Sequence, residues 1–258
     1  LNDLRLAGLD VLDVVLLAQL IGLVSYQARV VLGLQAMQGF DAWPGRAAVS
    51  TDEAFVHPAN LPAPGEPVRV HGFTSEALGW KAWVPVLDVS QASDHQWAVL
   101  KASHPTAHQS DYYLALVQQP QVLEARSAAF NAIMYAPGGL SRAERELAST
   151  VVSRVNACVY CASVHALRFE QLSKRNDVIV QVFTDPHQAG TTVRERALVQ
   201  ASIALTRAPA TFGAEHLRAL KDSGLGALEL LDWIHAVAVF AWANRLMLNL
   251  GEPVFPIR

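Results

Sequence analysis

Apolar residues recur at helical spacing along most of the chain, and this pattern predicts an all-α fold. Between residues 3 and 38, apolar side chains follow helical spacing with few charges, which indicates one or two helices. Because this stretch is apolar almost all round, we expect it to be buried rather than amphipathic. Its most apolar part, residues 14–26, is shorter than a membrane span requires. The acidic residues before it are not typical of a signal peptide.

Proline and glycine then divide the chain into two parts. Residues 39–72 hold five prolines and several glycines, which predicts a loop that covers the site or contacts another copy. Residues 74–103 are expected to be helical in two pieces, with Pro85 between them. We therefore expect an N-terminal helical region at residues 1–104 and a core at residues 105–258.

The core carries clear helix start and stop signals. Ser141 followed by Glu144 is a capping box, and Asn156 is a suitable cap for the next helix. No convincing alternation of apolar and polar residues predicts a strand. The expected helices are residues 109–118, 120–134, 141–155, 156–174, 193–206, 214–222 and 226–250, with residues 177–184 as a helix end and loop.

One internal similarity raises the possibility of two pseudo-repeats, with a degenerate N-terminal half. Shifting the chain by 134 residues aligns residues 21–30 with residues 155–164. The identical pairs are Tyr26 with Tyr160, Ala28 with Ala162, and Val30 with Val164. A duplicated helical unit whose first copy lost its cysteines and a chance similarity of two apolar helices explain this about equally well.

Composition excludes several classes of protein. Of the 258 residues, 52% are apolar and 17% charged, which is enough for a sizeable core. With a net charge of −3 and no basic run, we expect no nucleic-acid partner, and no membrane partner either. Two cysteines do not make a disulfide scaffold. A C-x-x-C pair in such a chain indicates a redox or metal site in a reducing compartment, so we expect a cytoplasmic protein.

The candidate chemistry lies between Glu146 and His165. Cys158 and Cys161 would share one face of a helix with His165, near the positive end of that helix. That position favours thiolate and lowers the cysteine pKa, and the imidazole can take the proton. Glu146, on the preceding helix, can orient the imidazole. Tyr160, between the cysteines, can hold a water or donate a proton to a leaving group.

Two other interpretations of this segment remain open. Cys158, Cys161, His165 and Glu146 are possible zinc ligands, although structural zinc sites usually bring a second distant pair. A thioredoxin-like site would place the motif after a strand, whereas here it follows a predicted helix.

Other conspicuous side chains have simpler explanations. We expect Trp80, Trp83 and Trp97 to pack in the core or at an interface. The spacing of His95, His104 and His108 fits no ligand pattern, so these loop histidines are expected to be solvated.

The site segment resembles the signature of the alkylhydroperoxidase AhpD-like branch of the carboxymuconolactone decarboxylase superfamily. The matching pattern is Glu146, eleven residues, Cys158-Val159-Tyr160-Cys161, three residues, and His165. Residues 140–148 and 238–245 are similar to the peroxidase-related branch. The resemblance is specific over residues 105–258 and weak over residues 1–104.

The resemblance implies a fold, a reaction and partners. It implies an AhpD-like helical bundle that assembles as homo-oligomers, either trimers or hexamers, without cofactor or metal. Glu146 would orient His165, and His165 would deprotonate Cys161. Cys161 would attack a hydroperoxide, and Cys158 would resolve the sulfenic acid as a disulfide. A dihydrolipoyl- or thioredoxin-like dithiol protein would reduce the disulfide.

The residues alone leave the order of attack and two further functions open. At the very start of its helix, Cys158 has the larger dipole benefit and is expected to be the cysteine more accessible to a protein partner. A cofactor-free lactone decarboxylase has no use for a dithiol, so both cysteines argue against that alternative. A non-enzymatic helical oligomer that senses redox state or holds zinc is the third reading.

Overall fold

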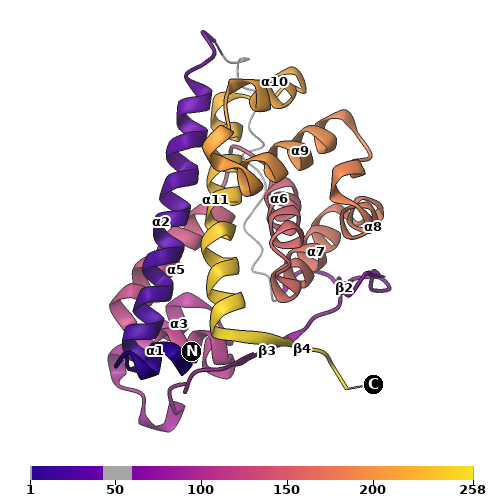
Figure 1. Cartoon of the computed structure of the whole chain (residues 1–258). Helices are drawn as coiled ribbons and strands as arrows, with labels where there is room; N and C mark the ends of the chain where they lie inside the picture. Colours follow the sequence, from indigo (N-terminus) through magenta and orange to yellow (C-terminus); the bar gives the residue numbers. More distant parts are fainter. Residues whose placement is uncertain (1, 43–59, 258) are drawn as a thin grey trace.

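The computed structural model describes residues 2–42 and 60–257 (Figure 1). This part of the chain is largely helical, which confirms the predicted all-α class. Two long helices, α2 (Val11–Met37) and α11 (Ala227–Leu250), lie side by side. The pair α6 (Arg142–Val155) and α7 (Val159–Ser173) packs against another side of α11. The site residues therefore lie between the C-terminal helix and this pair.

The boundaries of most core helices agree with the sequence signals. Ser141 caps α6, and its hydroxyl accepts a hydrogen bond from the backbone N–H of Glu144 at 3.3 Å. The other helices are α1 (Asn2–Leu6), α3 (Asp94–Ser103), α4 (Asp111–Leu116), α5 (Pro120–Tyr135), α8 (Asp177–Thr184), α9 (Val193–Arg207) and α10 (Ala214–Asp222). Short 3-10 helices span Val89–Gln91, Ala107–Gln109, Pro186–Gln188 and Pro209–Thr211.

Two short antiparallel sheets contradict the expectation that the chain has no strands. One pairs β1 (Arg69–Val70) with β2 (Phe73–Thr74), and the other pairs β3 (Gly79–Ala82) with β4 (Gly251–Val254). The first of the two helices expected within residues 74–103 is therefore wrong. β3 forms by pairing with β4, which follows α11 and is distant in the sequence, so no local sequence pattern predicts it. α11 ends at Leu250, as predicted, and the chain continues directly into β4 at Gly251.

Two further local predictions are wrong. Asn156 does not cap α7 but ends α6, and its side-chain amide donates to Asn244 on α11 at 3.0 Å. Cys158 takes the N-cap position of α7. The segment expected to be a helix end and loop is a complete helix, α8, because it buries an apolar face formed by Val178, Ile179, Val182 and Phe183.

α2 is only partly buried, contrary to the prediction from its composition. Its large exposed apolar side chains are Leu12, Leu16, Leu17, Leu20, Ile21, Val24, Val31 and Leu34. The helix has 27 residues, a mean hydropathy of 1.7 over its most apolar window, and 22% of that window buried. By length and composition alone it is able to cross a membrane, so the argument that the segment is too short is wrong. A helix packed against a protein core passes the same test.

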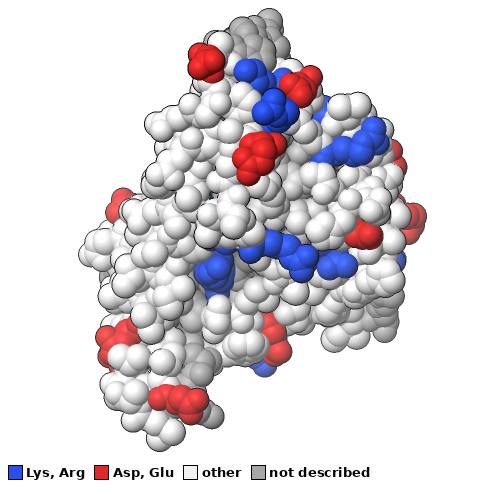
Figure 2. All heavy atoms as spheres, turned by 45° about the horizontal axis from the view of Figure 1, so that its top comes forward, with Lys and Arg blue, Asp and Glu red and all other residues white. Residues whose placement is uncertain are grey.

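Charged side chains cover only a small part of the face drawn in Figure 2. Uncharged side chains make up most of that face, with several basic side chains in a row across its middle and acidic side chains elsewhere. The small share of charged side chains agrees with the small net charge of −3.

The expected assembly into trimers or hexamers stays a prediction.

The structure describes the proline-rich segment at residues 39–42 and 60–72. Its remaining part, including Pro44 and Pro58, lies outside the described residues. The part from residue 60 contacts α7, where the backbone N–H of Gly65 donates a hydrogen bond to Glu170 Oε1 at 2.7 Å. The proposed repeat compares unlike structures, because residues 21–30 lie within α2 whereas residues 155–164 include the turn between α6 and α7. The repeat and the boundary after residue 104 stay predictions.

Close packing of α2 on α11 generates a test of the fold. A Cβ atom on Gly22 would overlap the ring of Trp242, which is itself held by a 2.9 Å hydrogen bond to Gln19. We expect Gly22→Val to lower the free energy of unfolding by about 1–3 kcal/mol, because the two helices must separate locally. Urea denaturation measures the change. The control Val24→Leu, on the exposed face, should stay within about 0.5 kcal/mol of the wild type. Equal stability of the two variants would contradict this packing.

Candidate active site

The dithiol lies at the turn between two packed helices. After α6 ends, Ala157 adopts a left-handed φ of 59°, which is uncommon for a residue with a side chain, and the chain reverses into α7. The backbone N–H of Cys158 donates to the carbonyl of Ser153 at 2.9 Å, which closes the turn. Cys158 and Cys161 are joined by a disulfide, with their Cα atoms 5.4 Å apart. Both sulfurs therefore lie in the first turn of α7, where the helix dipole favours thiolate.

The two cysteines are buried, and they face different surroundings. Cys158 is 1% exposed and Cys161 is 4% exposed, and both belong to a cluster of buried apolar side chains. The expectation that Cys158 is the more accessible residue is therefore wrong. The turn folds it under the apolar side chains that pack around the start of α7. Cys161 lines a cavity, and Cys158 is not among the described residues that do.

Glu146 and His165 form a buried pair across α6 and α7. His165 Nδ1 lies 2.5 Å from Glu146 Oε2, and the two residues are 9% and 1% exposed. This hydrogen bond confirms that the two helices bring the carboxylate to the imidazole. A carboxylate only accepts hydrogen bonds, so Nδ1 of His165 carries the proton and donates a hydrogen bond to Glu146. The Nε2 atom is then left as the basic nitrogen of the ring.

Neighbouring groups fix the position of this pair. The edge of the His165 ring meets Phe240 of α11, with ring centroids 4.2 Å apart. Arg142 Nε lies 3.9 Å from Glu146 Oε1, one turn earlier on α6, and its guanidinium lies over the ring of Tyr135. The nearby cation offsets the charge of a carboxylate that is almost wholly removed from water.

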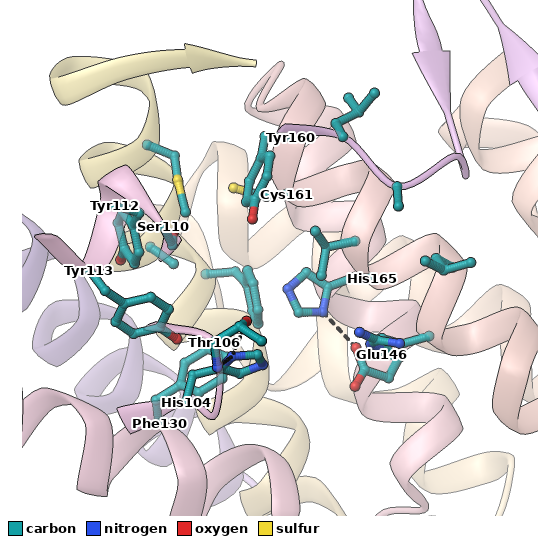
Figure 3. A pocket seen from close by; sticks show the side chains of 18 of the residues that line it. His104, Thr106, Ser110, Tyr112, Tyr113, Phe130, Glu146, Tyr160, Cys161 and His165 are labelled. Carbon is teal, nitrogen blue, oxygen red and sulfur yellow. Dashed lines mark hydrogen bonds and ion pairs between the residues drawn. The ribbon is translucent and has the colours of Figure 1, made fainter. Parts of the chain in front are cut away.

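A cavity of about 310 Å³ connects these parts. Figure 3 shows the His165 ring pointing into it below Tyr160 and Cys161, with Glu146 behind the ring. The facing wall is formed mainly by aromatic side chains. Helices α4, α5, α6, α7 and α11 and adjoining loops contribute to the lining, which includes Tyr112, Tyr113, Phe130, Tyr135, Tyr160, Phe240, His104 and Arg126. The arrangement places a thiol and an imidazole at one end of a mostly apolar chamber.

Tyr160 lies beside Cys161 with its hydroxyl toward the cavity (Figure 3). Burial, with a smaller effect of Tyr113, raises the pKa of Tyr160 to about 12. Burial also raises the pKa values of Tyr112, Tyr113 and Tyr135. These phenols stay protonated at neutral pH, so they are available as hydrogen-bond donors and not as bases.

Two residues of the cavity were not predicted from the sequence. His104 was expected to be solvated, but it lines the cavity, stacks on Tyr113 and accepts from the backbone N–H of Thr106 at 3.2 Å. Arg126 lies in the middle of α5 and belongs to no sequence motif that would predict a role in the site. Among the tryptophans, Trp80 is buried as predicted and donates to the carbonyl of Met247 at 3.2 Å, whereas Trp83 is half exposed.

The four residues weighed as zinc ligands are arranged as two pairs. Cys158 and Cys161 are bonded to each other, and Glu146 is hydrogen bonded to His165. Within residues 2–42 and 60–257, no group of three or more His, Cys, Asp or Glu side chains is placed to hold a metal ion.

The family comparison matches the centre of the chain. Residues 120–203, which run from the start of α5 into α9, match the carboxymuconolactone decarboxylase family. A search of curated proteins finds no match. The matched range contains Glu146, both cysteines and His165, and it supports the predicted resemblance on the segment that carries the site.

Solved structures share the fold. An uncharacterized peroxidase-related protein from Ralstonia eutropha JMP134, described as an alkylhydroperoxidase AhpD core, is 22% identical, with a TM-score of 0.58 over 66% of this chain and 90% of its own. An uncharacterized peroxidase-related protein from Silicibacter sp. TM1040 is 23% identical, with a TM-score of 0.54 over 64% and 89%. The debrominase Bmp8 is 17% identical, with a TM-score of 0.52 over 64% and 88%.

Together these findings define the class. The chain has an AhpD-like helical fold, and the predicted resemblance to the carboxymuconolactone decarboxylase superfamily is confirmed. Because the sequence identities are below 25%, these solved structures show a shared fold and not a shared activity.

The raised tyrosine pKa values predict how stability responds to alkaline pH. Folded protein keeps protons on residues such as Tyr160 that the unfolded chain loses above about pH 10. The stability of the oxidised protein should therefore fall as the pH rises from about 10 toward 12. We expect a shallower fall for Tyr160→Phe, which lacks the titrating group.

Urea unfolding midpoints at about pH 9 and about pH 11 measure this difference. The titration of the wild type in guanidinium gives the reference for unfolded tyrosines. An identical fall in the two proteins would show that Tyr160 titrates normally in the folded state.

Proposed function

We propose that this protein is a thiol-dependent peroxidase that reduces organic hydroperoxides through Cys161 and Cys158. The family match and the fold support a peroxidase-related or carboxymuconolactone decarboxylase-like role. The observation that carries the finer proposal is the shared cavity. It brings Cys161 of a vicinal cysteine pair together with an imidazole whose Nδ1 is fixed by a buried carboxylate.

In the reduced protein, His165 Nε2 takes the proton of the Cys161 thiol. The bond from Nδ1 to Glu146 keeps the ring in the tautomer with a basic Nε2 and stabilises the imidazolium that forms. The start of α7 stabilises the thiolate. Each of these effects acts on the sulfur that faces the cavity, so Cys161 is the attacking residue in this proposal.

The thiolate attacks the terminal oxygen of the hydroperoxide. A sulfur–oxygen bond forms, the oxygen–oxygen bond breaks, and the leaving alkoxide takes the proton held by His165 to become an alcohol. Tyr160, which stays protonated beside Cys161, is placed to donate a hydrogen bond to the leaving oxygen. Cys161 is then a sulfenic acid.

Cys158 completes the oxidation. Its sulfur attacks the sulfenic sulfur of Cys161, the disulfide forms, and the hydroxyl leaves with a proton as water. The described structure holds this disulfide. A dithiol then returns two electrons and two protons by exchange, so that one hydroperoxide and one dithiol give an alcohol, a water and a disulfide.

The burial of the pair bears on the choice of reductant. With Cys158 1% exposed, an attack on the disulfide from solvent is blocked, and Cys161 is reached through the cavity. A dihydrolipoyl group on a flexible arm is a small dithiol that can enter such a cavity. A thioredoxin-like protein presents its dithiol on a bulky surface. Of the two expected classes of reductant, the proposal therefore favours the dihydrolipoyl type.

Serine variants test the assignment of the two cysteines. Reduced wild type treated with cumene hydroperoxide should form the Cys158–Cys161 disulfide. Reduced Cys158→Ser should stop at a sulfenic acid that dimedone traps, because the resolving thiol is absent. Cys161→Ser should form neither product. Intact mass spectrometry distinguishes the three results.

Circular dichroism of both variants verifies that they remain folded. A dimedone adduct on Cys161→Ser would reverse the assignment of the attacking cysteine. Wild-type peroxide consumption by Cys161→Ser would contradict the peroxidase proposal itself.

A further inference from the structure

One cationic side chain in the cavity wall has no ionic partner among the described residues. Arg126, on α5, is 6% exposed and lines the cavity together with Cys161 and His165. Its guanidinium makes no hydrogen bond or ion pair with another side chain or backbone group of the described residues, and its Nε is buried without an acceptor. A buried charge without a partner opposes folding, so this position calls for an explanation.

Two other buried arginines, Arg145 and Arg29, use their terminal nitrogens as hydrogen-bond donors, although the Nε of each is buried without an acceptor like that of Arg126. Arg145 is 2% exposed, pairs with Asp232 at 2.8 Å, and donates to three backbone carbonyls. Arg29 is 7% exposed and donates to Ser25 and to the carbonyl of Thr206. The fold therefore supplies acceptors where a buried guanidinium serves packing. Arg126 is held without them.

Aromatic rings hold Arg126 in place instead. Its guanidinium carbon lies 5.4 Å from the ring centroid of Tyr112, 5.7 Å from that of Trp242 and 5.8 Å from that of Phe130. Rings that attract a cation keep the group fixed without consuming its N–H donors. A fixed guanidinium with free donors is the arrangement that binds a carboxylate through two parallel hydrogen bonds.

The neighbouring charges favour a single negative charge on the ligand. Arg168, a second arginine of the cavity wall, already donates to Gln171 at 2.6 Å. Glu146 adds a negative charge at the His165 end of the cavity. One free guanidinium matches a carboxylate better than a phosphate monoester, which carries about −1.5 to −2 at neutral pH.

We propose that Arg126 binds a carboxylate of the substrate, so that the protein acts on compact hydroperoxides that carry an acidic group. This inference rests on the proposed peroxidase function. The cavity of about 310 Å³ lies near the lower end of the roughly 300–1,000 Å³ common for small-molecule sites, which suits a ring-sized body. Tyr112 and Phe130 lie on the side facing Cys161 and His165 (Figure 3), so the carboxylate and the peroxide would occupy opposite ends.

A matched pair of hydroperoxides tests the proposal. Cumene hydroperoxide is neutral, and its para-carboxylate derivative adds only the anionic group. Wild type should turn over the carboxylate with a kcat/KM roughly 10- to 100-fold higher, the value of a charged hydrogen bond. Arg126→Met should bring the ratio of the two kcat/KM values close to one, and Arg126→Lys should restore part of the preference.

Binding gives a readout that does not depend on turnover. The para-carboxylate of cumyl alcohol, the expected product, should bind the oxidised wild-type protein in a calorimetric titration, and its methyl ester should bind more weakly by a similar factor. Arg126→Met should lose that difference. If neither peroxide is reduced while the carboxylate still binds through Arg126, the peroxidase proposal fails and the anion site stands. Equal binding of acid and ester by wild type overturns the anion site.

Thermal unfolding separates a binding role from a structural one. Removal of an unpartnered buried charge should leave the melting temperature of Arg126→Met unchanged or higher. The control Arg145→Met removes an arginine that is ion-paired with Asp232 and should lower the melting temperature clearly. If Arg126→Met melts as early as the control and keeps the wild-type substrate ratio, Arg126 is structural and the proposal is wrong.

Discussion

The hydrogen bond between Glu146 and His165 is the constraint on which the site depends. A carboxylate that is 1% exposed needs a partner within the protein, and the imidazole of α7 supplies it. This contact fixes the register of α7 against α6. With that register set, the intervening turn must be short, and its left-handed Ala157 places the cysteine pair at the start of α7. The position of the two cysteines thus follows from the hydrogen bond between Glu146 and His165.

The C-terminal helix holds this arrangement from behind. Asn244 of α11 donates to the hydroxyl of Ser153 at 3.1 Å and accepts from Asn156 at 3.0 Å, so it binds both sides of the turn between α6 and α7. Phe240, one turn earlier, contacts the His165 ring. α2 covers another side of α11 (Figure 1). Segments far apart in the sequence therefore converge on one short turn.

Local signals were sufficient for the core helices and for the carboxylate–imidazole contact, because caps and helical spacing act over a few residues. Long-range contacts were not predictable. β3 depends on pairing with β4, Asn156 is drawn to Asn244, and the burial of Cys158 depends on side chains from other elements. Arg126 shows the same limit, since its isolation becomes visible only when the cavity around it is assembled. The apolar composition of α2 led to a wrong prediction of burial, because many of its large apolar side chains are exposed among the described residues.

The role of the Glu146–His165 hydrogen bond is tested by the rate at which the reduced protein loses its two thiols to one equivalent of cumene hydroperoxide. We expect loss of both thiols per peroxide in wild type and roughly 10²-fold slower loss in Glu146→Gln, because the imidazole loses the carboxylate that orients it. Glu170→Gln alters a carboxylate on α7 that bonds Gly65 outside the cavity, and it should react like wild type. Equal rates in wild type and Glu146→Gln would contradict the central claim.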